Sequence, residues 1–143
     1  MKSYFAYGSN LWEKQMTQRC PESRKLGRAT LHGYRWIITT RGYASVVECK
    51  GESVEGVIYQ LSESDEAELD RFEGVAKRFY RKAELPIKSD SSEIIALVYI
   101  DPITKEGHPH QEYIARINLG IADAGLPESY VNASIRRFIP ENT

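Results

Sequence analysis

The sequence has few cysteine and histidine residues, which argues against sites built from either. Only Cys20 and Cys49 are present, far apart and without a C-x-x-C spacing. Neither a disulfide framework nor a zinc site is therefore predicted, and we expect two reduced thiols. The three histidines match no catalytic or metal-ligating pattern. The sequence therefore predicts no metal centre.

Long apolar runs and an excess of charge of one sign are also absent. The N-terminal apolar run is too short for a signal peptide and is broken by Gly8 and Asn10. No stretch approaches the length of a membrane span. We therefore expect a cytoplasmic protein without a membrane partner. The 19 basic and 20 acidic residues give a net charge of −1 without a basic stripe, which argues against nucleic-acid binding.

The length and composition are those of one globular domain. A chain of 143 residues can bury a core without a disulfide or metal, so we expect a single domain over residues 1–143. The apolar share of 41% and the charged share of 27% support an ordered, soluble fold. No oligomeric state follows from these numbers.

Short segments rich in Val, Ile and Tyr, separated by Gly, Ser, Asp or Pro, predict six strands. The predicted strands are residues 2–7, 34–40, 45–49, 54–61, 79–87 and 93–100. Helices are predicted at residues 11–18, at 62–72 with Ser62 as cap and Gly74 as stop, from Pro109 to Gly125, and again from Pro127. Few long helices lie between the strands, so a doubly wound sheet fits poorly. We predict an α+β fold with an antiparallel, barrel-like sheet and short flanking helices.

The first informative stretch is Tyr7-Gly8-Ser9-Asn10, which follows the first predicted strand. Gly8 permits a positive φ or a close backbone approach. Backbone N–H groups in such a turn, ahead of a helix, can bind a carboxylate or a carbonyl oxygen. The alternative is a plain strand-to-helix turn in which Asn10 is only a cap.

The second is Glu73, followed by Gly74 at the end of a predicted helix. A carboxylate there faces the negative end of the helix dipole, and Phe72 and Val75 beside it favour partial burial. Both effects raise a carboxyl pKa towards the range useful for proton transfer at neutral pH. The alternative is a solvated side chain without a role.

Together these stretches resemble the γ-glutamylcyclotransferase family (AIG2-like). That family has a Tyr-Gly-Ser-Asn loop after the first strand and an acidic residue about sixty positions later, as in residues 7–10 and at Glu73. Residues 119–130, Leu-Gly-Ile-Ala-Asp-Ala-Gly-Leu-Pro-Glu-Ser-Tyr, are similar to its C-terminal helix–Gly-Leu-Pro–helix segment. The resemblance extends from Tyr4 to about Ile139.

The resemblance implies a mixed β-barrel and an enzyme that uses no metal or organic cofactor. The implied reaction is cyclisation of a small γ-glutamyl substrate to 5-oxoproline with release of an amino acid. It implies Glu73 as the catalytic acid/base. The residues implied in substrate binding are Tyr4, Phe5, Ala6, Tyr7, Gly8, Ser9, Asn10 and Tyr113. Tyr80 and Tyr99 match further pocket tyrosines, but core packing explains them equally well.

Two other functions remain open at this stage. The first keeps the chemistry but takes γ-glutamyl amines, such as γ-glutamyl-lysine isopeptides or a γ-glutamylated biosynthetic intermediate. The second is a non-catalytic family member that binds a small acid. The presence of Glu73 argues against the second, because a protein without chemistry needs no carboxylate there.

Overall fold

Five strands close into a barrel in the computed structural model, which describes residues 1–141. The strand order around the barrel is β1-β3-β2-β4-β5. The strands are β1 (Lys2–Ala6), β2 (Arg24–Ile38), β3 (Ala44–Leu61), β4 (Arg81–Ser89) and β5 (Ser92–Ile100). Neighbours are antiparallel except β1 and β5, which pair in parallel at Tyr4 and Leu97. The predicted α+β class with a mixed, mainly antiparallel barrel is confirmed.

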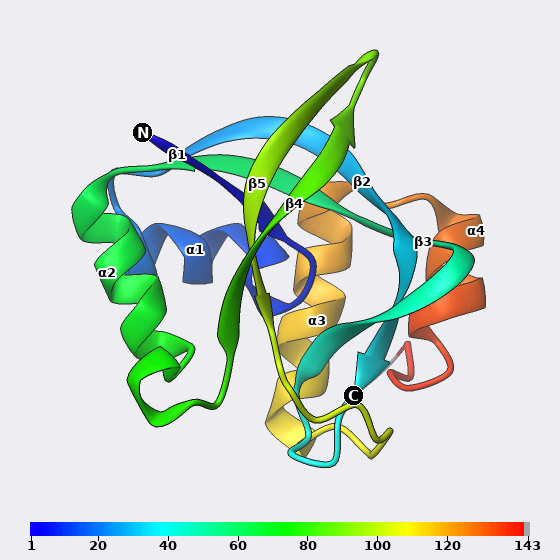
Figure 1. Ribbon diagram of the computed structural model, residues 1–143. Coiled ribbons are helices and arrows are strands. Elements are labelled where there is room, and N and C mark those ends of the chain that lie inside the picture. Colours follow the sequence, from blue (N-terminus) through cyan, green and yellow to red (C-terminus); the bar gives the residue numbers. More distant parts are fainter. Residues whose placement is uncertain (142–143) are drawn as a thin grey trace.

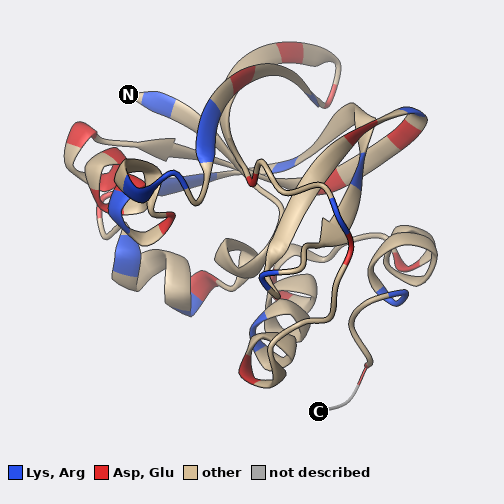
Figure 2. Cartoon of the chain, turned by 60° about the horizontal axis from the view of Figure 1, so that its bottom comes forward, with Lys and Arg blue, Asp and Glu red and all other residues tan. Residues whose placement is uncertain are grey.

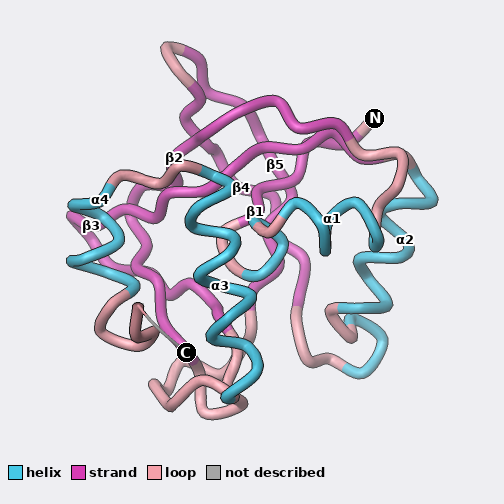
Figure 3. The backbone as a smooth tube through the Cα atoms, turned by 180° about the vertical axis from the view of Figure 1, so that it is seen from behind, coloured by secondary structure: helices cyan, strands magenta, loops and turns pink. Residues whose placement is uncertain are grey.

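Short helices surround the barrel (Figure 1). They are η1 (Ser9–Leu11), α1 (Glu13–Arg19), α2 (Glu63–Phe72), η2 (Val75–Lys77), α3 (Gln111–Ala124), α4 (Glu128–Tyr130) and the π-helix η3 (Val131–Ile135). The helices α1 and α2 lie together on one side of α3, and α4 lies on the other side (Figure 3). The tip of the β4–β5 hairpin projects from the barrel. No helix within residues 1–141 is long and apolar enough to cross a membrane.

The strands around Gly51 differ from the prediction. The segments predicted as two strands, 45–49 and 54–61, form the single strand β3, because its pairing with β2 resumes beyond Gly51. The strand β2 also starts at Arg24, well before the predicted residue 34. Its first part is rich in charge, and within residues 24–33 only Ala29 and Leu31 are buried, so it has no continuous apolar run that would mark it as a strand.

The helix α2 begins and ends where its local signals predict. The Ser62 side chain accepts a 3.1 Å hydrogen bond from the Asp65 N–H, and the Asp65 carboxylate accepts one from the Ser62 N–H, which forms a capping box. Gly74 ends the helix with a φ of 64°. Leu69 on this helix is fully buried, whereas Phe72 is 44% exposed.

The helix α3 holds the N-terminal loop against the barrel. It ends at Gly125, which has a φ of 60°. A Cβ atom at Gly120 would lie 2.8 Å from the Leu11 Cβ, so only glycine permits this close packing of α3 on η1. The packing brings Tyr113, near the start of α3, towards the loop after β1.

The surface carries both signs of charge on most of its elements (Figure 2), in keeping with the net charge of −1. Both cysteines are free, as expected. Cys20 is buried, which raises the pKa of its thiol to about 12, so this thiol stays neutral at physiological pH.

Candidate active site

A pocket opens between the loop after β1, the C-terminal end of α2 and the N-terminal half of α3. It collects side chains that are far apart in the sequence. Its lining consists of Tyr4, Tyr7, Gly8, Ser9, Asn10, Arg19, Arg41, Tyr43, Ala44, Phe72, Glu73, Phe79, Tyr80, Tyr99, Tyr113 and Arg116. The two informative stretches of the sequence therefore meet in one cavity.

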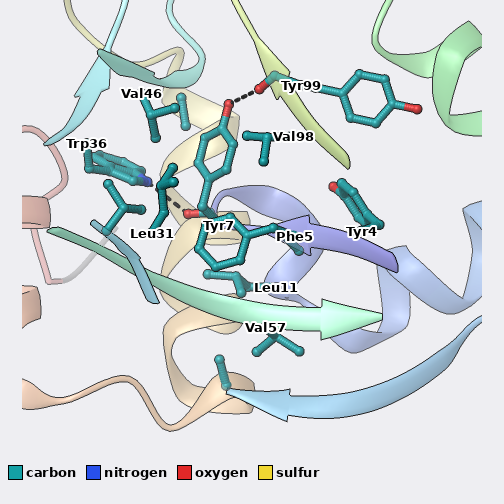
Figure 4. Packing of buried hydrophobic residues seen from close by; sticks show 14 of the residues in the cluster. Tyr4, Phe5, Tyr7, Leu11, Leu31, Trp36, Val46, Val57, Val98 and Tyr99 are labelled. Atoms are coloured by element: carbon teal, nitrogen blue, oxygen red, sulfur yellow. Dashed lines mark hydrogen bonds between the residues drawn. The ribbon is translucent and has the colours of Figure 1, made fainter. Parts of the chain in front are cut away.

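The strand that leads into the loop is anchored through Tyr7. Its hydroxyl group donates a 2.6 Å hydrogen bond to the Tyr99 carbonyl oxygen, and its own carbonyl oxygen accepts one of 2.8 Å from the Trp36 indole (Figure 4). These bonds connect β1 to β5 and β2. They fix the point at which the chain leaves the barrel and enters the loop.

The Asn10 side chain orients the loop and is not a helix cap. Its amide nitrogen donates to the Tyr4 hydroxyl oxygen at 2.9 Å. Its amide oxygen accepts from Gln15 Nε2 at 2.9 Å and from Arg19 Nη1 at 3.1 Å. The N–H groups of Ser9 and Asn10, in the first turn of η1, make no hydrogen bond within residues 1–141. The loop thus offers donors that the fold itself does not use.

Gly8 lies at a close approach to Ala44 and Tyr113 and does not adopt a positive φ. Its φ is −125°, so the first of its two predicted roles is wrong. A Cβ atom at this position would lie 3.2 Å from the Ala44 Cβ and 3.3 Å from the Tyr113 hydroxyl oxygen. Any larger side chain would therefore push into the lining of the pocket.

Phe5 and Ala6 do not line the pocket. Both side chains are fully buried in the barrel core, where Phe5 packs closely against Gly56. These two side chains are therefore not in contact with the pocket, and their part in substrate binding stays a prediction. In a strand, successive side chains point to opposite faces, and burial on both faces of β1 leaves neither exposed to a ligand.

Glu73 lies at the C-cap of α2, and its side chain lines the pocket. It makes no hydrogen bond or ion pair through its carboxylate within residues 1–141. Loss of hydration in the pocket raises the pKa of this carboxyl group to about 7, although the positive charges of Arg19, Arg41 and Arg116 oppose the rise. Glu73 can therefore take up and release a proton near neutral pH.

Three arginines in the lining were not predicted from the sequence. Arg41 forms an ion pair with the buried Asp101 at 2.9 Å, and Arg116 forms one with Glu112 at 2.7 Å. Arg19 donates to the Asn10 amide oxygen. Only Arg116 carried a usable signal, because it follows Tyr113 by three residues and so lies on the same face of α3.

The pocket tyrosines divide into two kinds by the direction of their hydrogen bonds. The hydroxyl groups of Tyr80 and Tyr99 donate to the Ala44 carbonyl oxygen at 2.7 Å and to Asp70 at 2.7 Å. The Tyr113 hydroxyl oxygen instead accepts a 3.3 Å hydrogen bond from the Ala44 N–H. Tyr4, which accepts from Asn10, is of the second kind.

Tyr4 and Tyr113 therefore keep their hydroxyl protons for a ligand. Neither donates a hydrogen bond to another residue within residues 1–141. Burial raises the pKa of both phenols above the ordinary value, so both remain neutral donors at physiological pH. All the predicted lining residues other than Phe5 and Ala6 thus share one pocket with Glu73.

This fold and pocket agree with comparisons to known proteins. The family profile described as "Gamma-glutamyl cyclotransferase, AIG2-like" matches residues 4–116, and the chain belongs to this family. The mouse protein named gamma-glutamylcyclotransferase is 28% identical over 138 residues, which cover 89% of this chain and 73% of the mouse protein.

Solved structures agree over nearly the whole chain. A structure of a gamma-glutamyl cyclotransferase superposes with a TM-score of 0.86 and 25% identity, covering 99% of this chain and 89% of its own. The crystal structure of YkqA from Bacillus subtilis gives a TM-score of 0.82 and 27% identity, with coverage of 95% of this chain and 53% of YkqA. The barrel with its outer helices is therefore the fold of the family.

Proposed function

We propose that the protein is a γ-glutamylcyclotransferase that converts a γ-glutamyl amino acid or dipeptide to 5-oxoproline and a free amino acid. The observation that carries this proposal is Glu73, an unpaired carboxylate in a pocket, with a pKa of about 7. Family membership and the names of the relatives support the same activity.

The reaction is an intramolecular acyl transfer whose atoms balance without water or a redox partner. The α-ammonium group of the substrate first loses a proton to Glu73. The amine nitrogen then attacks the γ-carbonyl carbon, a new C–N bond closes the five-membered ring, and the old amide C–N bond breaks. Glu73 returns its proton to the departing nitrogen, so one carboxyl group acts as base and then as acid.

Such a cyclisation needs orientation more than it needs a strong nucleophile. Holding the two reacting groups of one molecule together is worth on the order of 7–11 kcal/mol. The pocket is lined largely by buried or anchored side chains, including Tyr7, Tyr80 and Tyr99. A rigid lining of this kind suits the folding of a flexible glutamyl chain.

The transition state also places negative charge on the γ-carbonyl oxygen, which requires donors. The unused donors of the pocket are the N–H groups of Ser9 and Asn10 and the hydroxyl groups of Tyr4 and Tyr113. We assign these groups to the substrate, where they bind either its glutamyl carboxylate or the oxyanion. Their number is sufficient for both.

The proposal is tested by incubating the purified protein with a panel of γ-glutamyl amino acids and γ-glutamyl amines and measuring 5-oxoproline. Glu73→Gln keeps the size of the side chain but removes the base, and we expect kcat to fall by roughly 10²–10⁴-fold. Glu63→Gln, in the first turn of the same helix, is the matched control and should leave turnover unchanged. Absence of product from the whole panel, or equal effects of the two variants, would overturn the proposal.

A further inference from the structure

The charge balance of the three pocket arginines is uneven. Arg41 is paired with Asp101 and Arg116 with Glu112. Arg19, in contrast, has no acidic partner within 4.0 Å among residues 1–141. Its guanidinium group makes a single hydrogen bond in this part of the chain, through Nη1 to the Asn10 amide oxygen. It therefore retains a full charge and unused donors beside the cavity.

The position of Arg19 is fixed although its charge is not neutralised. Its guanidinium carbon lies 4.4 Å from the centre of the Phe72 ring, which is a cation–π contact. The buried Asn10 side chain also binds it, through the 3.1 Å hydrogen bond from Nη1. Arginine held in this way presents its remaining N–H groups in the fork geometry that matches a carboxylate.

Arg19 also lies on the exposed side of the pocket. Phe72, on which it stacks, is 44% exposed, and Phe79, the other exposed aromatic residue of the lining, is 45% exposed. The residue between Phe72 and Gly74 is the catalytic candidate Glu73. A substrate whose glutamyl part reaches the donors of the buried loop must therefore extend its departing part past Glu73 towards these two rings.

We propose, on the basis of the function assigned above, that Arg19 binds the free carboxylate of the departing amino acid and so selects γ-glutamyl amino acids over γ-glutamyl amines. A γ-glutamyl amino acid carries two carboxylates, and a γ-glutamyl amine lacks the second. The loop and the hydroxyl groups of Tyr4 and Tyr113 accommodate the first. Arg19 is the pocket cation without an acidic partner in the described chain, and it accommodates the second.

The test uses two substrates that differ only at the proposed contact, γ-glutamyl-L-alanine and γ-glutamyl-L-alaninamide. We expect the wild-type protein to prefer the acid, and Arg19→Gln to lower kcat/KM for the acid by roughly 10–100-fold, the range for a lost charge-assisted hydrogen bond. Removal of the Arg19 charge also raises the pKa of Glu73 for both substrates, so both are measured well above pH 7, where Glu73 is ionised, and there the variant should lower kcat/KM for the amide much less than for the acid. Comparing the two ratios cancels the different intrinsic reactivities of the two amide bonds.

Arg71→Gln is the matched control, because Arg71 also stacks on Phe72, at 4.5 Å, but does not line the pocket. It should not change the preference. Arg19→Lys, which keeps the charge, should retain part of the preference for the acid. Equal losses for both substrates in Arg19→Gln, or a wild-type protein without preference, would overturn the assignment while leaving the cyclotransferase activity standing. Absence of 5-oxoproline from both substrates would also overturn the assignment, whereas absence from the whole panel of γ-glutamyl compounds would contradict the activity itself.

Discussion

The hydroxyl group of Tyr99 donates a 2.7 Å hydrogen bond to Asp70, which lies three residues before Glu73 on α2. The other oxygen of Asp70 accepts a 3.0 Å hydrogen bond from Lys82. Strands β5 and β4 thus hold the last turn of the helix, and the carboxylate at its C-cap is positioned by the barrel. The carbonyl oxygen of Tyr99 also accepts a hydrogen bond from the Tyr7 hydroxyl group. Tyr99 therefore connects the loop after β1 with the helix end that carries Glu73.

Replacement of Tyr99 by phenylalanine should loosen this attachment. Tyr99→Phe leaves the ring in place but removes the donor to Asp70, and we expect a loss of roughly 1–2 kcal/mol in the free energy of unfolding. Turnover should fall as well, because Glu73 is held less firmly. Urea unfolding and kcat measurements check both effects. Tyr34→Phe, which removes a hydroxyl group that makes no hydrogen bond in the described chain, is the control; a similar result for both variants would contradict the positioning role.

Features that depend on neighbouring residues could be predicted from the sequence. Ser62 and Gly74 delimit α2, and Gly125 ends α3, because capping and left-handed glycine are local properties. The position of Glu73 at a helix end was predicted in the same way. Its raised pKa was predicted too, and the partial burial expected beside Phe72 and Val75 agrees with loss of hydration as the main physical cause.

Features that depend on distant contacts could not be predicted. Arg19, Arg41 and Arg116 belong to three separate segments, and only the closed barrel brings them together. The family resemblance implied that Phe5 and Ala6 bind substrate, yet both side chains lie in the core. The direction in which a tyrosine hydroxyl donates is likewise set by its neighbours in space.

The rate should depend on pH through the ionisation of Glu73. The base form is required, so kcat/KM should rise with pH through about 7, the pKa of this carboxyl group. Arg116→Gln removes a positive charge that lowers this pKa, so the acidic limb of the pH–rate profile should move to higher pH. The variant should lose activity at pH 7 and regain it at higher pH. Arg24→Gln, at an exposed position outside the pocket, should not move the limb. A limb unchanged in Arg116→Gln would contradict the assignment of this pKa to Glu73.

Filling the space beside Gly8 should weaken the binding of ligands in the pocket. The new side chain in Gly8→Val would displace Ala44 or the Tyr113 hydroxyl group, which lie 3.2 and 3.3 Å from the position of its Cβ. We expect the affinity for 5-oxoproline to fall about tenfold or more, because misplaced contacts in a preorganised site are costly. Calorimetric titration measures the effect. Ser3→Val, on the strand β1 that precedes the loop but away from the pocket, is the control. Unchanged affinity in a folded Gly8→Val variant would show that the loop does not contact the ligand.

The stability of the protein should also report the environment of Glu73. Its pKa is about 7 in the folded chain against an ordinary value of 4.5, so the folded state binds the proton more tightly than the unfolded state. The resulting stabilisation is complete below pH 4.5 and is lost as the pH rises through 7.

Glu73→Gln is always neutral and avoids this loss. We expect it to be more stable than the wild-type protein at pH 8.5 by roughly 1–3 kcal/mol, since each pKa unit corresponds to about 1.4 kcal/mol and water in the pocket reduces the full effect. At pH 4 the two proteins should be equally stable. Glu63→Gln should show the opposite sign at pH 8.5, because it removes a favourable charge from the helix N-terminus. Urea unfolding at the two pH values measures these differences. If the Glu73→Gln variant gains no stability at pH 8.5, the Glu73 carboxylate is well hydrated in the folded protein. A hydrated carboxylate would not be a base matched to neutral pH.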